Sequence, residues 1–276
     1  KAFSGHRLHE IDLLNEYYSA ILLAKLRETN KMEQANDGKR MPTLFITGAG
    51  RRLGLHLVEF YLSMGWRVIA QFNTKNELSI ESQAEYAANG QYIGIAADLS
   101  SMDEVKSLID GVVEFLRVCD TSLDAVIHNA SCFWPDTQQA SFDERWQQHT
   151  IFQTVHVTAP QAMSLALVGF IKPTGCIIAI TDIYADFPNS RFASYCSAKA
   201  GLQNLALSWA QIFAPHVRVN VIQPGPVKFL PEHDEQYRDK VLSQSLLGRE
   251  LGYEAIQQGI DYLINATALT GSILKV

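Results

Sequence analysis

The sequence predicts an α/β fold in which one parallel sheet is covered by helices on both faces. From residue 43 onward, short apolar segments alternate with longer segments whose apolar residues recur at helical spacing. The short segments are apolar throughout, as expected for strands that are buried on both faces. The chain has 276 residues, of which 47% are hydrophobic, so it can form one α/β domain with a full core.

The expected elements alternate along the chain. The predicted strands are residues 43–46, 67–72, 92–96, 125–128, 176–180 and 218–222. The predicted helices are residues 53–64, 79–89, 102–118, 151–170 and 194–213. This order predicts a Rossmann-type, doubly wound parallel sheet in a single domain that covers residues 41–276.

The first forty residues differ from the rest. Residues 8–27 carry apolar side chains at a spacing of three to four, which predicts an amphipathic helix. Residues 28–40 are polar and are expected to form a linker. The sequence leaves three origins open for this extension: the remnant of a tag, the tail of a fused upstream domain, or a docking helix.

Composition excludes several classes of protein. The net charge of −6 disfavours nucleic acid as a partner, because nucleic-acid binding requires a basic face. We find no apolar run of the ~18 residues that span a bilayer and no secretory signal, so we expect no membrane partner and a cytoplasmic location. The four cysteines form neither a CxxC pair nor a zinc-binding spacing, which predicts reduced thiols and no metal site.

A glycine-rich turn follows the first predicted strand and opens the first predicted helix. Residues 47–54 read Thr-Gly-Ala-Gly-Arg-Arg-Leu-Gly. Gly48 allows the backbone to turn tightly beside a pyrophosphate, and the N-terminus of a helix attracts phosphate. This placement predicts dinucleotide binding, and the alternative is an ordinary strand-to-helix loop.

Two features favour NADP(H) as the dinucleotide. Arg51 and Arg52 lie in the turn, and guanidinium groups match the geometry of phosphate oxygens. Their alternative role is a solvated surface pair. After the second strand, Asn73, Thr74 and Lys75 occupy the positions where an NAD enzyme often carries an acidic residue for the ribose 2′-hydroxyl.

Candidate catalytic side chains follow the fifth strand. Tyr195 and Lys199 are four residues apart in a predicted helix and therefore share one of its faces. An ammonium beside a phenol is expected to lower the phenol pKa toward the range of proton transfer, although a chance pair on a helix is the alternative. Asp182 directly follows the strand and can act on a nitrogen-rich substrate, or it can simply cap a turn.

Other polar and turn residues follow neighbouring strands. His128-Asn129-Ala130-Ser131 ends the fourth strand, and Pro224-Gly225 follows the sixth. In open α/β sheets, ligands bind at the carboxyl ends of the strands. We therefore expect these residues to meet Asp182 and Tyr195 at one edge of the sheet.

Taken together, these motifs resemble one enzyme family over residues 41–276. The shared features are Thr47-Gly48, Asp98-Leu99, Asn129-Ala130, Tyr195-x-x-x-Lys199, Asn220 and Pro224-Gly225. They resemble the short-chain dehydrogenase/reductase family, which implies hydride transfer involving NADP(H), with Asp182, Tyr195 and Lys199 as the catalytic residues. The resemblance implies that the cofactor contacts Gly48, Arg51, Arg52, Leu53, Asn73, Thr74, Lys75, Asp98, Leu99, Asn129, Ala130, Ser131, Tyr195, Lys199, Pro224 and Gly225.

Three departures from the wider family resemble the pteridine reductases. Arg52 replaces the second glycine of the turn, Asp182 replaces the catalytic serine, and Ser131 ends a His-Asn-Ala-Ser segment. Residues 129–135 resemble the stretch that contacts the pterin, and residues 232–238 resemble bacterial dihydromonapterin reductases. This resemblance implies a substrate site formed by Arg52, Ser131, Phe133, Asp182 and Tyr195, in which Phe133 stacks on the pterin.

The resemblance implies NADPH-dependent reduction of a dihydropterin (7,8-dihydromonapterin, a related dihydropteridine or dihydrofolate) by a homo-oligomer, either a tetramer or a dimer. His156 stands where the wider family has an asparagine that relays protons, so the relay is expected to differ. Two alternatives remain. One is a carbonyl or alcohol oxidoreductase acting on another small substrate, and the other is a non-catalytic dinucleotide-binding regulatory protein, which the intact Tyr195 and Lys199 disfavour.

Overall fold

A single parallel sheet organises the molecule, as predicted. The computed structural model describes residues 40–137, 139–229, 234–243 and 245–276, so the predicted helix over residues 8–27 lies outside the described residues. Within them, seven strands are hydrogen-bonded in the order β3-β2-β1-β4-β5-β6-β7. They are β1 Thr43–Ile46, β2 Arg67–Phe72, β3 Tyr92–Ala96, β4 Leu123–His128, β5 Ile171–Ile180, β6 Arg218–Gln223 and β7 Ile273–Lys275.

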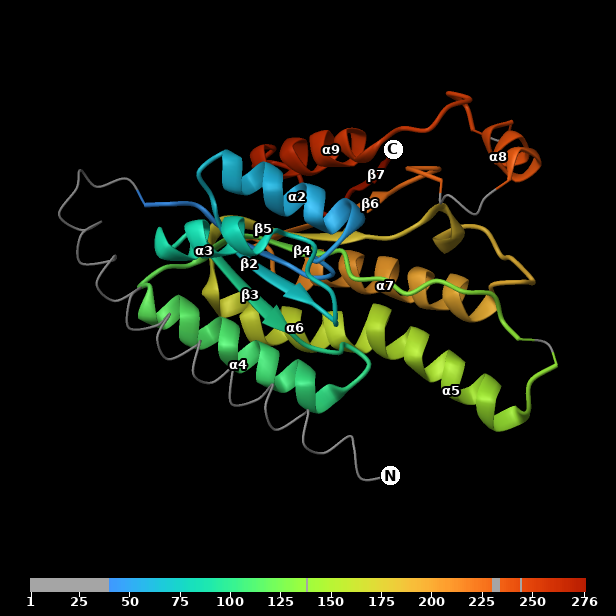
Figure 1. The fold of residues 1–276 in the computed structure, drawn as a ribbon, viewed down its shortest axis with the longest axis horizontal. Coiled ribbons are helices and arrows are strands. Elements are labelled where there is room, and N and C mark those ends of the chain that lie inside the picture. Colours follow the sequence, from blue (N-terminus) through green and yellow to red (C-terminus); the bar gives the residue numbers. More distant parts are fainter. Residues whose placement is uncertain (1–39, 138, 230–233, 244) are drawn as a thin grey trace.

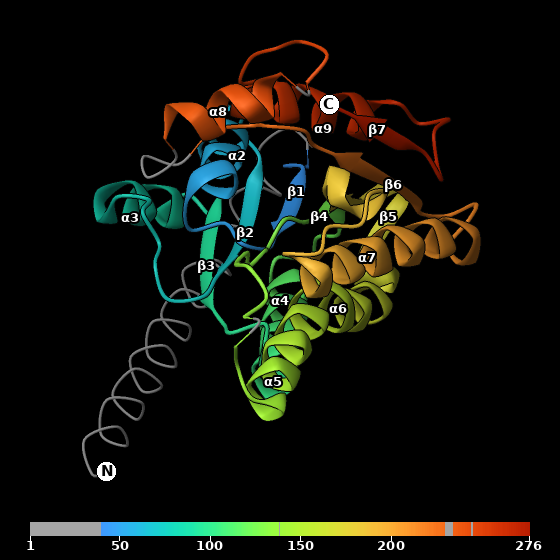
Figure 2. The ribbon, with the colours of Figure 1, turned by 90° about the vertical axis from the view of Figure 1, so that its right-hand side faces the viewer.

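Helices cover both faces of this sheet (Figure 1). They are α2 Arg52–Ser63, α3 Ile80–Ala88, α4 Met102–Val118, α5 Phe142–Gln153, α6 Ala159–Leu167, α7 Ala193–Ile212, α8 Glu235–Leu242 and α9 Tyr253–Asn265. Alternate strand residues point to opposite faces. Leu44 and Ile46 therefore pack with α2 and α9, whereas Phe45 packs with α4, α6 and α7 (Figure 2).

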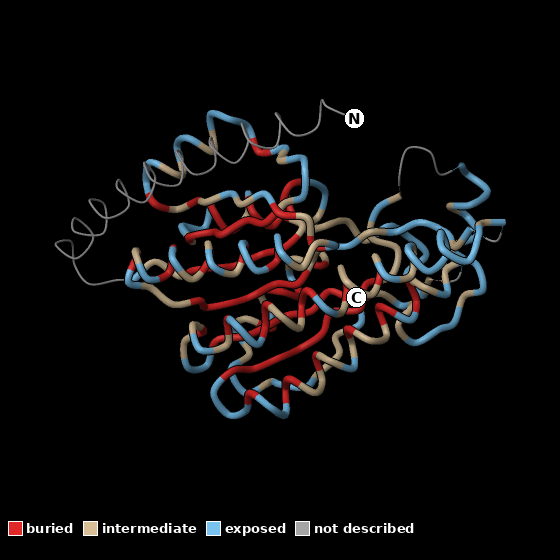
Figure 3. The backbone as a smooth tube through the Cα atoms, turned by 90° about the horizontal axis from the view of Figure 1, so that it is seen from below, coloured by how far each residue is buried: buried red, intermediate tan, exposed pale blue. Residues whose placement is uncertain are grey.

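The order of the strands reverses beside β1, which defines the edge where ligands bind. Ile46 of β1 lies opposite Ala70 of β2 on one side and Ile127 of β4 on the other. A crevice forms at the carboxyl ends of strands at such a switch point. Buried residues follow the strands and the helix faces that pack against them (Figure 3).

The helix predicted over residues 151–170 begins nine residues earlier, so this boundary was wrong. Ser141 caps α5 by accepting a hydrogen bond from the Glu144 N–H, and the Glu144 carboxylate accepts one from the Ser141 N–H. This capping box is visible in the sequence as Ser-x-x-Glu. Periodicity missed it because Phe152 is the only buried residue described in α5.

The same run of helix widens in its middle into a π-helix, Thr154–Thr158. Pro160 explains the widening, because it has no N–H and its ring would clash with the carbonyl of His156 four residues earlier. The Ala159 N–H instead bonds to the Thr154 carbonyl, five residues back. The wide turn carries the fully buried His156.

Other differences are smaller. β4 and β5 begin at Leu123 and Ile171, earlier than predicted, and α8, α9 and β7 were not predicted. In α9, Ile256, Ile260 and Leu263 are buried against the sheet. The sequence therefore carries an apolar stripe at helical spacing there, which the prediction overlooked. The short β7 is defined only by its pairing with β6.

Candidate active site

The glycine-rich turn is clamped between the ends of β2 and β4. Gly48 has a φ of 65°, in the left-handed region, and a Cβ there would lie 2.6 Å from the Cα of Ala130. The Asn129 side-chain amide donates to the carbonyls of Thr47 and Gly48, at 3.0 and 3.1 Å. The Gly48 N–H donates to the side-chain oxygen of Gln71, at 2.9 Å. Only glycine fits this position.

Arg52, the first residue of α2, also adopts a left-handed backbone, with a φ of 54°. Such a conformation costs a non-glycine residue about 1 kcal/mol, which is consistent with glycine at this position in the wider family. Both Arg51 and Arg52 are exposed. No side chain among the described residues caps the N-terminus of α2, where Arg51 is the N-cap and Arg52 the first residue. The first N–H groups of this helix therefore remain uncapped next to two arginines.

The loop after β2 packs directly on this turn. A Cβ at Gly50 would lie 1.9 Å from the carbonyl oxygen of Lys75. Asn73, Thr74 and Lys75 are exposed, so their side chains are accessible beside the turn. At the end of β3, Asp98 accepts a hydrogen bond from the Ser100 N–H, at 2.8 Å, and starts the turn into α4.

Asp182 and Tyr195 meet at the carboxyl end of β5. The Tyr195 hydroxyl donates to Asp182 Oδ2 at 2.9 Å. The other carboxyl oxygen accepts from the Tyr184 N–H at 3.0 Å and caps the short 3₁₀ helix Ile183–Ala185. Both interpretations of Asp182 therefore hold, because one oxygen caps the turn and the other faces the phenol.

Lys199 lies beneath this pair. Its ammonium is buried, with 2% exposed surface, and donates to the Ile180 carbonyl at 3.0 Å. It lies 5.7 Å from the centre of the Tyr195 ring, so the predicted shared helix face exists. Burial lowers the pKa of Lys199 to about 8.

The pKa of Tyr195 differs from the one expected for a phenol beside an ammonium. Burial, followed by the charge and hydrogen bond of Asp182, raises the pKa of Tyr195 well above its ordinary value. The pKa of Tyr195 is therefore raised rather than lowered as expected, and the phenol keeps its proton. Burial also raises the pKa of Asp182. The site holds a protonated phenol beside a carboxyl group that accepts a proton more readily than usual.

His156, which stands at the relay position of the wider family, joins the site from the π-helix. Its Nε2 lies 2.9 Å from the Ser131 hydroxyl and 3.4 Å from the Cys132 N–H. Its Nδ1 lies 2.9 Å from the carbonyl oxygen of Phe152. Spacing gave no signal for this contact, since His156 and Ser131 come from different elements.

Aromatic rings line the approach to Tyr195. Phe133 is 50% exposed, lies edge-on to Tyr195 at 4.8 Å and stacks on Phe192 at 4.7 Å. The ring of Tyr184 stacks in turn on Phe192, at 6.2 Å. The sequence indicated Phe133 but gave no sign of Phe192, which stacks on it, or of Tyr184, which stacks on Phe192.

A model of short-chain dehydrogenases matches residues 42–240. The chain belongs to the short-chain dehydrogenase family. It is 32% identical to dihydromonapterin reductase of Klebsiella pneumoniae subsp. pneumoniae over 84% of this chain and 94% of that protein. It is 31% identical to the same enzyme of an Enterobacter species, over 83% of this chain and 92% of that protein.

A solved structure has the same fold. Alternative dihydrofolate reductase 1 from Brucella canis, complexed with NADP, is 24% identical and superposes with a TM-score of 0.71. The match covers 85% of this chain and 91% of that chain. The family therefore confirms the predicted doubly wound fold and the assignment of this chain to the oxidoreductases.

Neither a membrane span nor a metal site is found within the described residues. None of their helices is both long and apolar enough to cross a bilayer. Nor do they bring together three His, Cys, Asp or Glu side chains in an arrangement that could hold a metal ion.

His128 was expected at the ligand-binding edge of the sheet, but the structure places it elsewhere. It is buried, and its Nε2 lies 2.8 Å from the Ser164 hydroxyl. Its ring packs 5.8 Å from that of Trp209, and no described atom is a hydrogen-bond partner for Nδ1. It therefore belongs to the core beneath α6 and α7 rather than to the ligand edge.

We expect the two buried histidines to destabilise the fold in acid. Burial lowers the pKa of His128 to about 4 and that of His156 to about 3, from 6.5. Below pH 6.5 the unfolded chain binds these protons first, so stability is lost as the pH falls toward the folded-state values. Each histidine lowers the unfolding free energy by about 2 kcal/mol between pH 7 and 5.

Urea unfolding of wild type and of His128→Asn at pH 7 and pH 5 checks this expectation. The substitution removes one titrating group, so the loss of stability on acidification should shrink by about 2 kcal/mol. His149→Asn, on the outer part of α5, is the control and should keep the wild-type loss. An equal loss in wild type and His128→Asn would show that His128 is protonated in the folded state.

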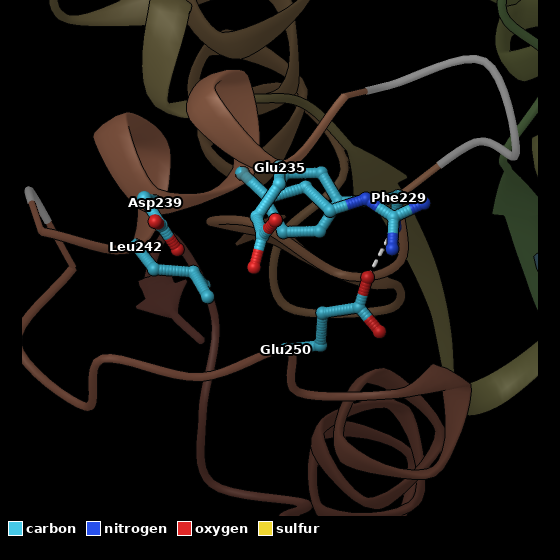
Figure 4. A pocket seen from close by; sticks show the side chains of 6 residues that line it. Phe229, Glu235, Asp239, Leu242 and Glu250 are labelled. Carbon is cyan, nitrogen blue, oxygen red and sulfur yellow. Dashed lines mark hydrogen bonds between the residues drawn. The ribbon is translucent and has the colours of Figure 1, made fainter.

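A hollow of about 540 Å³ lies beside α8. Phe229, Glu235, Asp239, Leu242 and Glu250 line it, together with Arg238 (Figure 4). None of the described residues that line it is a predicted catalytic residue. It therefore adds no group to the site around Tyr195.

Proposed function

We propose that this protein uses NADPH to reduce a 7,8-dihydropterin to its tetrahydro form. The substrate is 7,8-dihydromonapterin or a related dihydropteridine or dihydrofolate. The names of its relatives support this function. The observation that carries the proposal is the Asp182 carboxyl, which is hydrogen-bonded to Tyr195 where a carbonyl reductase of this family would have a serine hydroxyl.

The turn at residues 47–54 fits a dinucleotide. At Gly48 and Gly50 a Cβ would clash with the backbone of Ala130 and Lys75, so the turn can take this tight path only with glycine, as a pyrophosphate-binding turn does. Arg51 and Arg52 would bind phosphate oxygens, and Lys75 and Asn73 would bind the 2′-phosphate. When bound, NADPH supplies the hydride. Lys199 would bind the nicotinamide ribose.

Asp182 and Tyr195 would handle the proton. Because burial raises the pKa of Asp182, this carboxyl group holds a proton better than an exposed one and can donate it to a ring nitrogen of the pterin. The Tyr195 hydroxyl donates a hydrogen bond to Asp182 Oδ2 and so orients the carboxyl group. A serine hydroxyl could not supply a proton at this acidity, which favours a C=N bond as the substrate.

Phe133 would provide the flat surface for the pterin ring. Phe192 covers one side of the Phe133 ring and holds it in place. The ring remains half-exposed, so it can stack on a planar ligand next to Tyr195.

Oxidation of NADPH, followed with 7,8-dihydropterin, with a simple ketone and without substrate, tests the proposal. We expect consumption with the dihydropterin alone and formation of the tetrahydropterin in equal amount. Consumption with the ketone alone would instead identify a carbonyl oxidoreductase. No consumption, despite measurable NADPH binding, would identify a regulatory dinucleotide-binding protein.

We expect the enzyme to prefer NADPH to NADH, because Arg52 and Lys75 are exposed at the turn and residues 73–76 include no acidic side chain. Asn73→Asp places a carboxylate beside the expected 2′-phosphate and should lower kcat/KM for NADPH about tenfold, because the two negative charges repel each other. Lys106→Glu, a charge change on the exposed surface of α4, is the control. Equal use of both cofactors by wild type would overturn the preference.

We further propose that the protein is a homo-oligomer, a tetramer or a dimer. Phe142 and Trp146 on α5 stack on each other but are 73% and 62% exposed. Exposed Leu165 on α6 and Ile212 on α7 add to the apolar surface of the neighbouring helices. Light scattering at the concentration used for assays should give a multiple of 30.8 kDa, whereas a monomer mass would refute the assembly.

A further inference from the structure

His156 is a buried histidine whose two ring nitrogens both have partners. Its Nδ1 lies 2.9 Å from the backbone carbonyl of Phe152. Its Nε2 lies 2.9 Å from the Ser131 hydroxyl and 3.4 Å from the Cys132 N–H. The rings of Phe152 and Tyr195 pack against it, with their centres at 6.0 and 5.6 Å.

These partners determine which nitrogen carries the proton. A carbonyl oxygen can only accept, so Nδ1 must donate and must carry a hydrogen. Burial keeps the ring neutral at physiological pH. A neutral ring with a hydrogen on Nδ1 has a lone pair on Nε2. The Cys132 N–H, which can only donate, is directed at the same nitrogen and agrees with this assignment.

The polarity of Ser131 follows from this tautomer. Since Nε2 can only accept, the Ser131 hydroxyl must donate its single hydrogen to His156. The Ser131 oxygen then has only lone pairs left for other partners. The Tyr195 hydroxyl donates its one hydrogen to Asp182 Oδ2, so these lone pairs are left for a ligand.

We propose that His156 is a positioning residue that holds the Ser131 hydroxyl as a pure hydrogen-bond acceptor toward the reaction site. The Ser131 oxygen then accepts from an N–H group of the ligand, and it does not donate to a phosphate or carbonyl oxygen. The part of this inference that concerns a ligand N–H rests on the proposed function, since a dihydropterin carries such donors and a simple ketone does not.

The backbone is built to present this ring. Pro160 enforces the wide turn Thr154–Thr158, which carries His156 into the interior at the end of β4. Its Nδ1 bond to Phe152 is made within the same run of helix and fixes the plane of the ring. The Nε2 lone pair is therefore aimed at Ser131 before any ligand binds.

The tautomer can be observed without any substrate. Protein labelled with ¹⁵N-histidine is examined by NMR at neutral pH, and the His156 signals are identified by their loss in His156→Phe. We expect a neutral ring with its hydrogen on Nδ1, and a shift of the Nε2 signal in Ser131→Ala. A hydrogen on Nε2, or a charged ring, would overturn the proposal whether or not the protein reduces pterins.

Cofactor binding gives a second test that is independent of the substrate. If Ser131 donates only to His156, Ser131→Ala should leave the dissociation constant of NADPH within about twofold of wild type, because no charge-assisted hydrogen bond to phosphate is lost. A weakening of about tenfold or more would show that Ser131 donates to the cofactor and would overturn the proposal.

A double-mutant cycle tests the coupling in catalysis. Ser131→Ala and His156→Phe should each lower kcat/KM for dihydropterin about tenfold. The double variant should lose no more than either alone, because each substitution breaks the same Ser131–His156 hydrogen bond. His156→Gln retains an acceptor oxygen and should recover at least about a third of wild-type activity. His149→Phe is the matched control and should be unchanged. Additive losses, or no recovery in His156→Gln with a normal fold, would contradict the coupling.

Discussion

Tyr195→Phe is expected to lower turnover of dihydropterin by about 10²–10⁴-fold, the usual contribution of a group that acts in proton transfer. The substitution removes only the hydroxyl that bonds to Asp182 at 2.9 Å. The ring contacts with Phe133 and Phe152 remain. The dissociation constant of NADPH, measured by fluorescence titration, should therefore stay near that of wild type.

The control for this variant is Tyr262→Phe, the same chemical change on the exposed face of α9. It should leave both turnover and cofactor binding unchanged. Wild-type turnover in Tyr195→Phe would remove the phenol from the proton path. Loss of NADPH binding together with turnover would instead indicate that the hydroxyl maintains the structure of the site.

Asp182→Ser and Phe133→Ala should fail in different kinetic constants. Asp182→Ser removes the buried carboxyl that donates the proton, so we expect kcat for dihydropterin to fall about 10²-fold or more. Phe133→Ala removes a stacking surface worth about 0.5–1.5 kcal/mol, so KM should rise by up to about tenfold with a smaller change in kcat. Steady-state kinetics with saturating NADPH separates the two effects.

The dual role of Asp182 requires its own control. Asn caps a turn about as well as Asp, so Asp182→Asn preserves the bond from the Tyr184 N–H while removing the acid. We expect its kcat to be as low as that of Asp182→Ser. If Asp182→Asn retains wild-type kcat, the carboxyl is a structural cap, and the proposed pterin substrate rests on similarity to relatives alone.

Local patterns in the sequence predicted much of this protein. The buried strands and the helices with apolar stripes were found because burial on a continuous face leaves a period in the sequence. The turn around Gly48 and the shared helix face of Tyr195 and Lys199 were also predicted, since each depends on residues within eight positions of one another. The start of α5 was missed because its exposed first turns leave no such period, although its capping box is present.

The chemistry of the site was decided by contacts between distant segments. The pKa of Tyr195 is raised by its burial and by Asp182, although Lys199 shares its helix face. His128 and His156 have the same side chain, but the tertiary structure places one in the core and the other against Ser131. Desolvation and the direction of hydrogen bonds depend on which groups meet in three dimensions. The sequence by itself therefore determined the fold and the candidate residues, whereas only the tertiary structure decided their protonation and their partners.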